Sequence, residues 1–99
     1  MAKQREVIWT AGARTDLDEI VAYIAKDSPT VALAFLEEVL TTAESLTTLS
    51  ERGRILPELQ DPGVRELFIK RYRLFYEVRT DTVHVLGLLH GAREFKKRE

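Results

Sequence analysis

The stretch VRELFIKRYRLFYEVRTDTVHVLGLLH, residues 64–90, decides the fold. It holds three apolar-rich runs, at 64–69, 72–78 and 83–89. In the middle run, apolar and polar side chains tend to alternate, which is typical of a β-strand. The pairs 70–71 and 80–81 separate the runs, and separators this short are typical of hairpins. The stretch therefore predicts an antiparallel three-stranded meander.

Because side chains on a strand alternate between faces, two-residue loops would fix which residues share a face. The predicted core face carries the better apolar set: Leu67, Ile69, Tyr72, Leu74, Tyr76, Val78, Val83, Val85, Gly87 and Leu89. The opposite face gathers Phe68, Arg73, Phe75, Glu77, His84, Leu86, Leu88 and His90, with Glu77 across from His84. A three-residue first loop would instead exchange the faces of residues 64–69 and move Arg65 to the Arg73 side.

The second face is expected to stay uncovered, because few residues remain to pack on it. An apolar patch with a basic rim usually marks a partner site on a monomer. The alternative is that residues 91–99 fold back over it. The basic run 96–98 is either a solvated chain end or a contact for phosphate or an acidic target.

Upstream, residues 6–10 are β-prone, and two helical patterns follow. The first has Leu17, Ile20, Val21 and Ile24 on one stripe, with Asp16, Asp18 and Glu19 in its early turns. Ser28 and Pro29 fit the N-cap and first position of a second helix. Its apolar face reads Ala32, Phe35, Leu36, Val39, Leu40, Ala43, Leu46 and Leu49. With 53–63 as a loop, the order is β-α-α-β-β-β, an α+β fold with an N-terminal strand and a helical hairpin on a small antiparallel sheet.

The composition fits one domain, residues 1–99, with 96–99 as a frayed end. The 99 residues are 44% hydrophobic and 31% charged, which is ordinary for a soluble domain. Cysteine is absent, so thiolate chemistry is excluded, and with two histidines we expect no metal and no cofactor. The start MAKQREVIW has no apolar signal core and no run is long enough for a membrane span, so we expect a cytoplasmic protein.

Charge is uneven: acids outnumber bases in residues 1–50, and bases outnumber acids in 51–99. A basic second half would favour an anionic partner, either nucleic acid or an acidic protein surface. The alternative is a solvated surface of mixed charge, because acids are interleaved with the bases.

Five segments resemble the RelE/ParE superfamily of bacterial toxins from type II toxin–antitoxin modules, and most closely its ParE-like branch. They are DLDEIVAYIA (16–25), GRILPEL (53–59), VRELF (64–68), YRLFYEV (72–78) and TVHVLGLLHGAR (82–93). The resemblance implies the same β-α-α-β-β-β order. It also implies a ParD-like antitoxin, usually encoded beside the toxin, whose C-terminal segment wraps the toxin.

The resemblance leaves two mechanisms open. ParE-like members, of plasmid-stabilising ParDE-like modules, resemble inhibitors that bind DNA gyrase and block replication. RelE-like members resemble ribosome-dependent endoribonucleases that cut mRNA, which requires a base, an acid and cations. A third reading is a small interaction module without toxicity.

Carried over residue by residue, the ribonuclease set falls on Arg65, Arg73, His90 and Arg93 and is incomplete. A second lysine has no counterpart, because Glu66 and Leu67 stand there. A late tyrosine is missing too, since Phe95 is the only aromatic residue of 94–99 and cannot transfer a proton. We therefore expect a gyrase inhibitor without catalytic residues. Its expected contacts with target or antitoxin are Arg73, Phe75, Leu86, His90, Arg93, Phe95, Lys96 and Lys97.

Each of these residues also has a structural interpretation. Arg65 could be a solvated arginine on an edge strand, and Arg73 could pair with Glu66 or Glu77. His90 could be a hydrogen-bonded histidine at a strand end. Arg54 and Glu58 are expected to pair with each other and pin the 53–63 loop.

Overall fold

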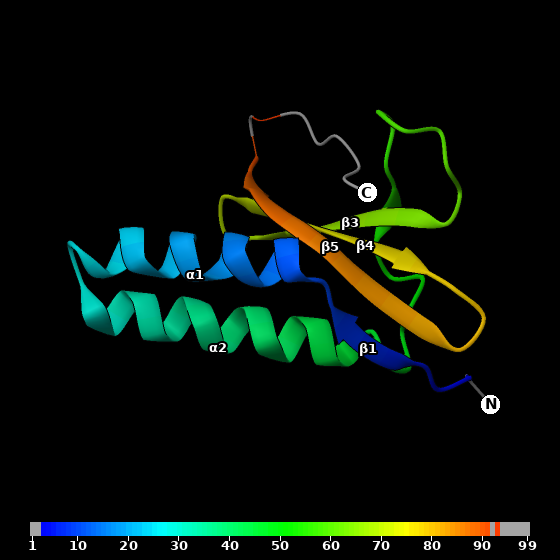
Figure 1. The fold of residues 1–99 in the computed structure, drawn as a ribbon, viewed down its shortest axis with the longest axis horizontal. Helices are drawn as coiled ribbons and strands as arrows, with labels where there is room; N and C mark the ends of the chain where they lie inside the picture. Colours follow the sequence, from blue (N-terminus) through cyan, green and yellow to red (C-terminus); the bar gives the residue numbers. More distant parts are fainter. Residues whose placement is uncertain (1–2, 92, 94–99) are drawn as a thin grey trace.

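The computed structural model describes residues 3–91 and 93, in which two helices and five strands form two layers (Figure 1). The elements are β1 (Glu6–Trp9), α1 (Ala11–Ala25), α2 (Pro29–Ser45), β2 (Arg54–Ile55), β3 (Val64–Ile69), β4 (Tyr72–Val78) and β5 (Thr82–His90). The predicted bounds of β3 and β4 are met to the residue. None of the described helices is long and apolar enough to cross a membrane.

Both helices begin at a hydroxyl side chain that caps free backbone N–H groups. Ser28 Oγ accepts a bond from Val31 N, with Pro29 at the first helical position, as predicted. At α1 the cap is Thr10, whose Oγ1 accepts from Ala13 N, so this helix starts earlier than predicted. The first turn of α1 therefore holds no acidic residue, and the predicted acids of the early turns begin with Asp16 in the second turn.

The sheet has the strand order β1-β5-β4-β3-β2. The C-terminal meander β3-β4-β5 is antiparallel, and Lys70 and Arg71 form the two-residue first loop. The predicted α+β fold is confirmed, but the sheet is mixed, because β1 pairs with β5 in parallel. The short strand β2, inside the predicted 53–63 loop, extends the sheet beyond β3.

A β-bulge in β5 changes which residues face the helices. Glu77 pairs with His84 as predicted, but the next pairs are Tyr76 with Val85 and Phe75 with Gly87, which leaves Leu86 as an extra residue. A bulge shifts the alternation by one position. Leu88 therefore joins the helix-side core, and Leu89 packs on the other face, opposite to the predicted assignment of both.

Each face of the sheet carries its own apolar cluster. The helix-side core includes Phe35, Val39, Leu74, Tyr76 and Val85. On the opposite face, Leu56 and Leu59 from the segment after β2 pack on Phe75, Leu86 and Leu89. That segment covers the face we expected to stay open, so the prediction of an uncovered face is wrong. The predicted apolar face of the second helix also extends too far, because α2 ends at Ser45, before Leu49. Of the residues predicted for this face, Leu40 and Leu49 are exposed.

Candidate functional site

Arg73 lies at the centre of a chain of alternating charges on the sheet face opposite the helices. Its Nε donates to Glu66 Oε1 at 2.6 Å, and its Nη2 donates to both carboxylate oxygens of Glu58 at 3.0 Å. Arg54 pairs with the other oxygen of Glu66. The Arg73 side chain is only 7% exposed, and that of Glu66 is fully buried. This arrangement holds the guanidinium in one place and satisfies its charge.

The carboxylates also set the protonation of Arg73. Burial alone would lower its pKa, but the hydrogen bonds and charges of Glu66 and Glu58 outweigh burial and raise the pKa above its ordinary value. Arg73 therefore stays a cation and serves neither as acid nor as base. Its guanidinium carbon also lies 4.8 Å from the centre of the Phe75 ring, a cation–π contact.

The network pins the segment between β2 and β3 onto the sheet. In place of the expected pair of Arg54 with Glu58, Arg54 pairs with Glu66, and Glu58 pairs with Arg73. Glu66 and Arg73 in turn pair with each other. The structural interpretation of Arg73, pairing with Glu66, is confirmed. Beneath this segment Phe75 is fully buried and Leu86 is partly buried, so Phe75 offers no surface to a partner in this conformation.

The other predicted residues lie elsewhere. Arg65 precedes the buried Glu66 on β3, so the two side chains face opposite sides of the sheet. Arg65 Nη1 donates to the backbone oxygens of Gly53 at 2.8 Å and Glu51 at 3.3 Å. It is not on an edge strand, since β2 pairs outside it. His90 packs edge-on against Tyr72, with ring centres 5.8 Å apart, on the helix side rather than beside Arg73 as predicted.

His90 and Arg93 line a common hollow of about 210 Å³ between β5 and α1, together with Tyr72, Asp16 and Glu19. Arg93 also connects this hollow with the Arg73 network, because Arg73 Nη1 donates to the backbone oxygen of Arg93 at 2.8 Å. The candidate ribonuclease set is thus divided between the two faces of the sheet. Phe95, Lys96 and Lys97 lie outside the described residues.

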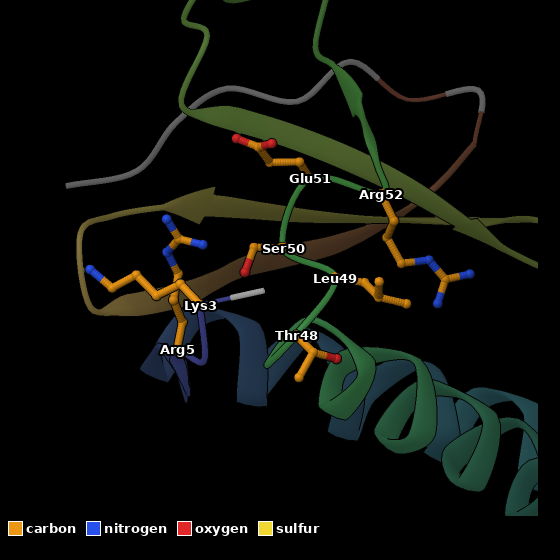
Figure 2. A pocket seen from close by; sticks show the side chains of 7 residues that line it. All are labelled: Lys3, Arg5, Thr48, Leu49, Ser50, Glu51 and Arg52. Atoms are coloured by element: carbon orange, nitrogen blue, oxygen red, sulfur yellow. The ribbon is translucent and has the colours of Figure 1, made fainter. Parts of the chain in front are cut away.

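Two further hollows were not predicted from the sequence. One, of about 400 Å³, lies beside the end of α2 and is bordered by Lys3, Arg5 and Arg52 (Figure 2). The other, of about 390 Å³, is almost wholly apolar and lies between the helical hairpin and the β3–β4 turn. Within residues 3–91 and 93, no group of three or more histidine or acidic side chains is arranged to hold a metal ion.

Two solved structures share this fold. The chromosomal ParDE toxin–antitoxin system from P. aeruginosa matches with a TM-score of 0.71 at 23% identity, covering 88% of this chain and 96% of that one. The toxin–antitoxin complex RelBE2 from Mycobacterium tuberculosis matches with a TM-score of 0.59 at 26% identity, covering 92% and 95%. The fold is therefore that of the RelE/ParE superfamily of small toxins.

Sequence comparisons identify the family of this chain within the superfamily. Toxin RelE2 of Caulobacter vibrioides is 36% identical over 89 residues, which cover 89% of this chain and 97% of that protein. Putative toxin Y4kP of Sinorhizobium fredii is 30% identical over 98 residues, covering 93% and 94%. The family model of the ParE toxin of the type II toxin–antitoxin system parDE matches residues 7–95. The chain belongs to this ParE toxin family.

Proposed function

We propose that this toxin arrests bacterial growth by binding DNA gyrase and blocking replication, without cutting RNA. The observation that carries the proposal is the position of Arg73. Two carboxylates and a backbone oxygen occupy its guanidinium, on the sheet face opposite the hollow that holds His90. Four hydrogen bonds engage this guanidinium and two carboxylates balance its charge, which leaves it poorly suited to stabilise the charge that develops on a phosphate during cleavage.

A cognate antitoxin is the second partner in the proposal. The structural relatives are toxin–antitoxin complexes, and type II toxins are defined by such a pair. An antitoxin segment that orders on binding would neutralise the toxin by covering its contact surface.

One observation favours the ribonuclease alternative. His90, Tyr72 and Arg93 line the same hollow, and they combine an imidazole with a phenol and a cation. In that alternative the hollow, and not Arg73, would be the site of RNA cleavage on the ribosome.

The test is to induce the toxin alone in a bacterial host and to follow DNA and protein synthesis by pulse labelling. We expect DNA synthesis to stop first and the purified protein to inhibit supercoiling by purified gyrase. If protein synthesis stops first, and mRNA is cut in a purified translation mix, the ribonuclease is the correct reading. Normal growth on induction would indicate an interaction module without toxicity.

A double variant, His90→Ala with Arg93→Ala, then tests the hollow. Both side chains are exposed, so the fold should survive. Arg73→Ala is unsuitable for this purpose, because it would leave Glu66 buried with one partner fewer and destabilise the protein by about 3–5 kcal/mol. Reduced toxicity of the folded double variant would place target contacts in the hollow, whereas full toxicity would remove these two residues from the contact surface.

A further inference from the structure

Cationic side chains gather at the end of the molecule that holds the N-terminal segment and the β4–β5 turn (Figure 1). Arg5 joins the N-terminal segment to two other parts of the chain: its backbone N–H donates to the oxygen of Thr47 and its Nε to the oxygen of Arg79, each at 2.8 Å. Arg65, on β3, donates to the oxygen of Gly53 at 2.8 Å. The cations that these contacts bring to one basic end are Lys3, Arg5, Arg52, Arg65 and Arg79.

Acidic side chains compensate two of these cations. Lys3 Nζ lies 3.1 Å from Asp81 Oδ1, and Arg79 Nη2 lies 2.9 Å from Glu77 Oε1. Both acids lie in or beside the β4–β5 turn. The carboxylates of this turn are therefore already engaged by cations of the same end.

The other three arginines bond uncharged oxygens. Arg52 Nη1 donates to the hydroxyl of Ser45 at 2.7 Å, while Arg5 and Arg65 donate to backbone oxygens. Across residues 3–91 and 93, no carboxylate forms an ion pair with any of the three. A neutral acceptor orients a guanidinium without cancelling its charge, and each guanidinium has five N–H donors, so charge and donors remain for a ligand.

The excess positive charge also acts on the core beneath it. Burial raises the pKa of Tyr76 and the bond from Gly53 lowers it. Arg65 and Arg52 lower this pKa further, and each does so by more than Glu51 raises it. The arginines therefore outweigh Glu51, the acid that borders the hollow at this end.

The hollow of about 400 Å³ lies among these cations. Figure 2 shows Lys3 and Arg5 on one side of it and Arg52 on the other, with Ser50 between them. Of the described residues that line the hollow, Leu49 is the only apolar one. Interfaces between proteins have an apolar core, whereas interfaces with DNA are more polar and much more positively charged. The lining therefore favours phosphate groups over a protein surface.

We propose that the basic end binds the sugar–phosphate backbone of duplex DNA through Arg5, Arg52 and Arg65. Such contacts neutralise phosphates and carry no sequence information, so binding is independent of sequence and sensitive to salt. The inference rests on the proposed function for the place of the encounter, because gyrase acts on DNA, and on the hollow for the chemistry of recognition. The toxin would then contact both the enzyme and the DNA that the enzyme holds.

The first test variant is Arg5→Gln with Arg52→Gln. The side-chain bonds it removes are both exposed, so the fold should survive. The matched control is Lys26→Gln with Arg71→Gln, which changes the net charge by the same amount. Both control residues are exposed, Lys26 at the turn between α1 and α2 and Arg71 in the β3–β4 turn, away from the basic end.

The second test variant is Glu51→Gln, which removes the acid beside the hollow. Its side chain is exposed, and in the contacts described it is the backbone oxygen of Glu51 that accepts a bond, so folding should be unaffected. We expect DNA binding to strengthen by roughly threefold at low salt. The matched control is Glu37→Gln, on an exposed position in the middle of α2, which should leave binding unchanged.

The probe is a labelled duplex DNA of about two helical turns, titrated with each purified variant by fluorescence anisotropy between about 50 mM and 200 mM salt. We expect the Arg5–Arg52 double variant to weaken binding by roughly tenfold or more at the lower salt. The slope of log K against log salt should fall by about two in magnitude, because two phosphate contacts are lost. The Lys26–Arg71 control should change the affinity by less than about threefold.

Supercoiling by purified gyrase, measured with the same proteins, separates this inference from the proposed function. A wild-type protein that inhibits gyrase but does not bind the duplex, or a control that loses as much affinity as the double variant, overturns the DNA contact alone. Competition by polyglutamate that matches unlabelled DNA at equal charge would assign the basic end to an acidic protein surface and also overturn it. Duplex binding that behaves as expected in a protein without effect on gyrase overturns the proposed function alone.

Discussion

At the scale of single residues, Gly53 shows how closely the segment before β2 approaches the sheet. A Cβ atom placed on Gly53 would lie 2.6 Å from the backbone oxygen of Glu66 and 2.6 Å from the hydroxyl of Tyr76. Its own N–H donates to that hydroxyl at 2.8 Å. The absence of a side chain therefore lets the chain cross over Tyr76 and start β2 in register with β3.

Gly53→Ala is expected to lower the free energy of unfolding by about 2–4 kcal/mol, because backbone and a buried phenol must both move. Gly63→Ala is the matched control. There the nearest atom, Asp61 Oδ1 at 3.3 Å, belongs to a flexible side chain. Urea unfolding of both variants checks the difference, and equal losses would show that the contact at Gly53 is not the cause.

The residue scale also shows what the sequence could reveal of the site. The pairing of Arg73 with Glu66 was foreseeable, because the two strands were placed correctly and both residues face the same side. The contribution of Glu58 was not, because it lies in an irregular segment whose path no periodicity encodes. The same segment buries Phe75, which is why the second sheet face was misread as open.

At the scale of elements, the hydroxyls that cap the two helices differ in the hydrogen bonds they make. The Ser28 hydroxyl bonds only the first turn of its own helix among the contacts described. Thr10 accepts from Ala13 N and also donates to the backbone oxygen of Val85 at 2.8 Å, in the middle of β5. The Thr10 hydroxyl therefore ties the start of α1 to the sheet.

Ser28→Ala should cost about 1 kcal/mol, the usual value for a lost cap. Thr10→Ala should cost about 2 kcal/mol, because it also leaves the oxygen of Val85 without this bond. Thermal unfolding would show the order as a larger fall in Tm for Thr10→Ala, by several degrees in a chain of this length. If Ser28→Ala proved the more damaging, the link through Thr10 would contribute little.

Elements with strong periodicity were predicted well, and irregular ones were not. The runs 64–69 and 72–78 and the Ser28–Pro29 helix start carry local signals strong enough to fix their bounds. The bulge at Leu86 has no such signal, since residues 85–89 are apolar apart from Gly87, and either register looks equally good. That one extra residue moved Leu88, Leu89 and His90 from their predicted faces.

At the scale of the whole molecule, burial couples stability to alkaline pH through Tyr76. Its side chain is fully buried in the helix-side core, and burial raises its pKa above the ordinary 10.0, although the bond from Gly53 partly opposes this. A raised pKa means that the native state holds the phenol proton more tightly than the unfolded chain. This contribution is fully present below pH 10 and is lost as pH rises from 10 through the native pKa.

We expect the free energy of unfolding to fall above pH 10, with Tyr76 contributing at most about 1.4 kcal/mol per pH unit. Tyr76→Phe should be less stable at pH 8, because the Gly53 N–H loses its acceptor, but should show a shallower fall above pH 10. Urea unfolding at pH 8, 10 and 11 measures both curves. Parallel curves would assign the alkaline loss to other groups.

The parallel pairing of β1 with β5 has a consequence for synthesis. The bond from Thr10 to Val85 spans 75 positions, and every residue of β1 pairs with a residue of β5. Contacts this distant in sequence form late, and no earlier strand can substitute for β5 between β1 and β4. On the ribosome β1 cannot pair until β5 has emerged, so a translation product that ends before β5 lacks the five-stranded sheet.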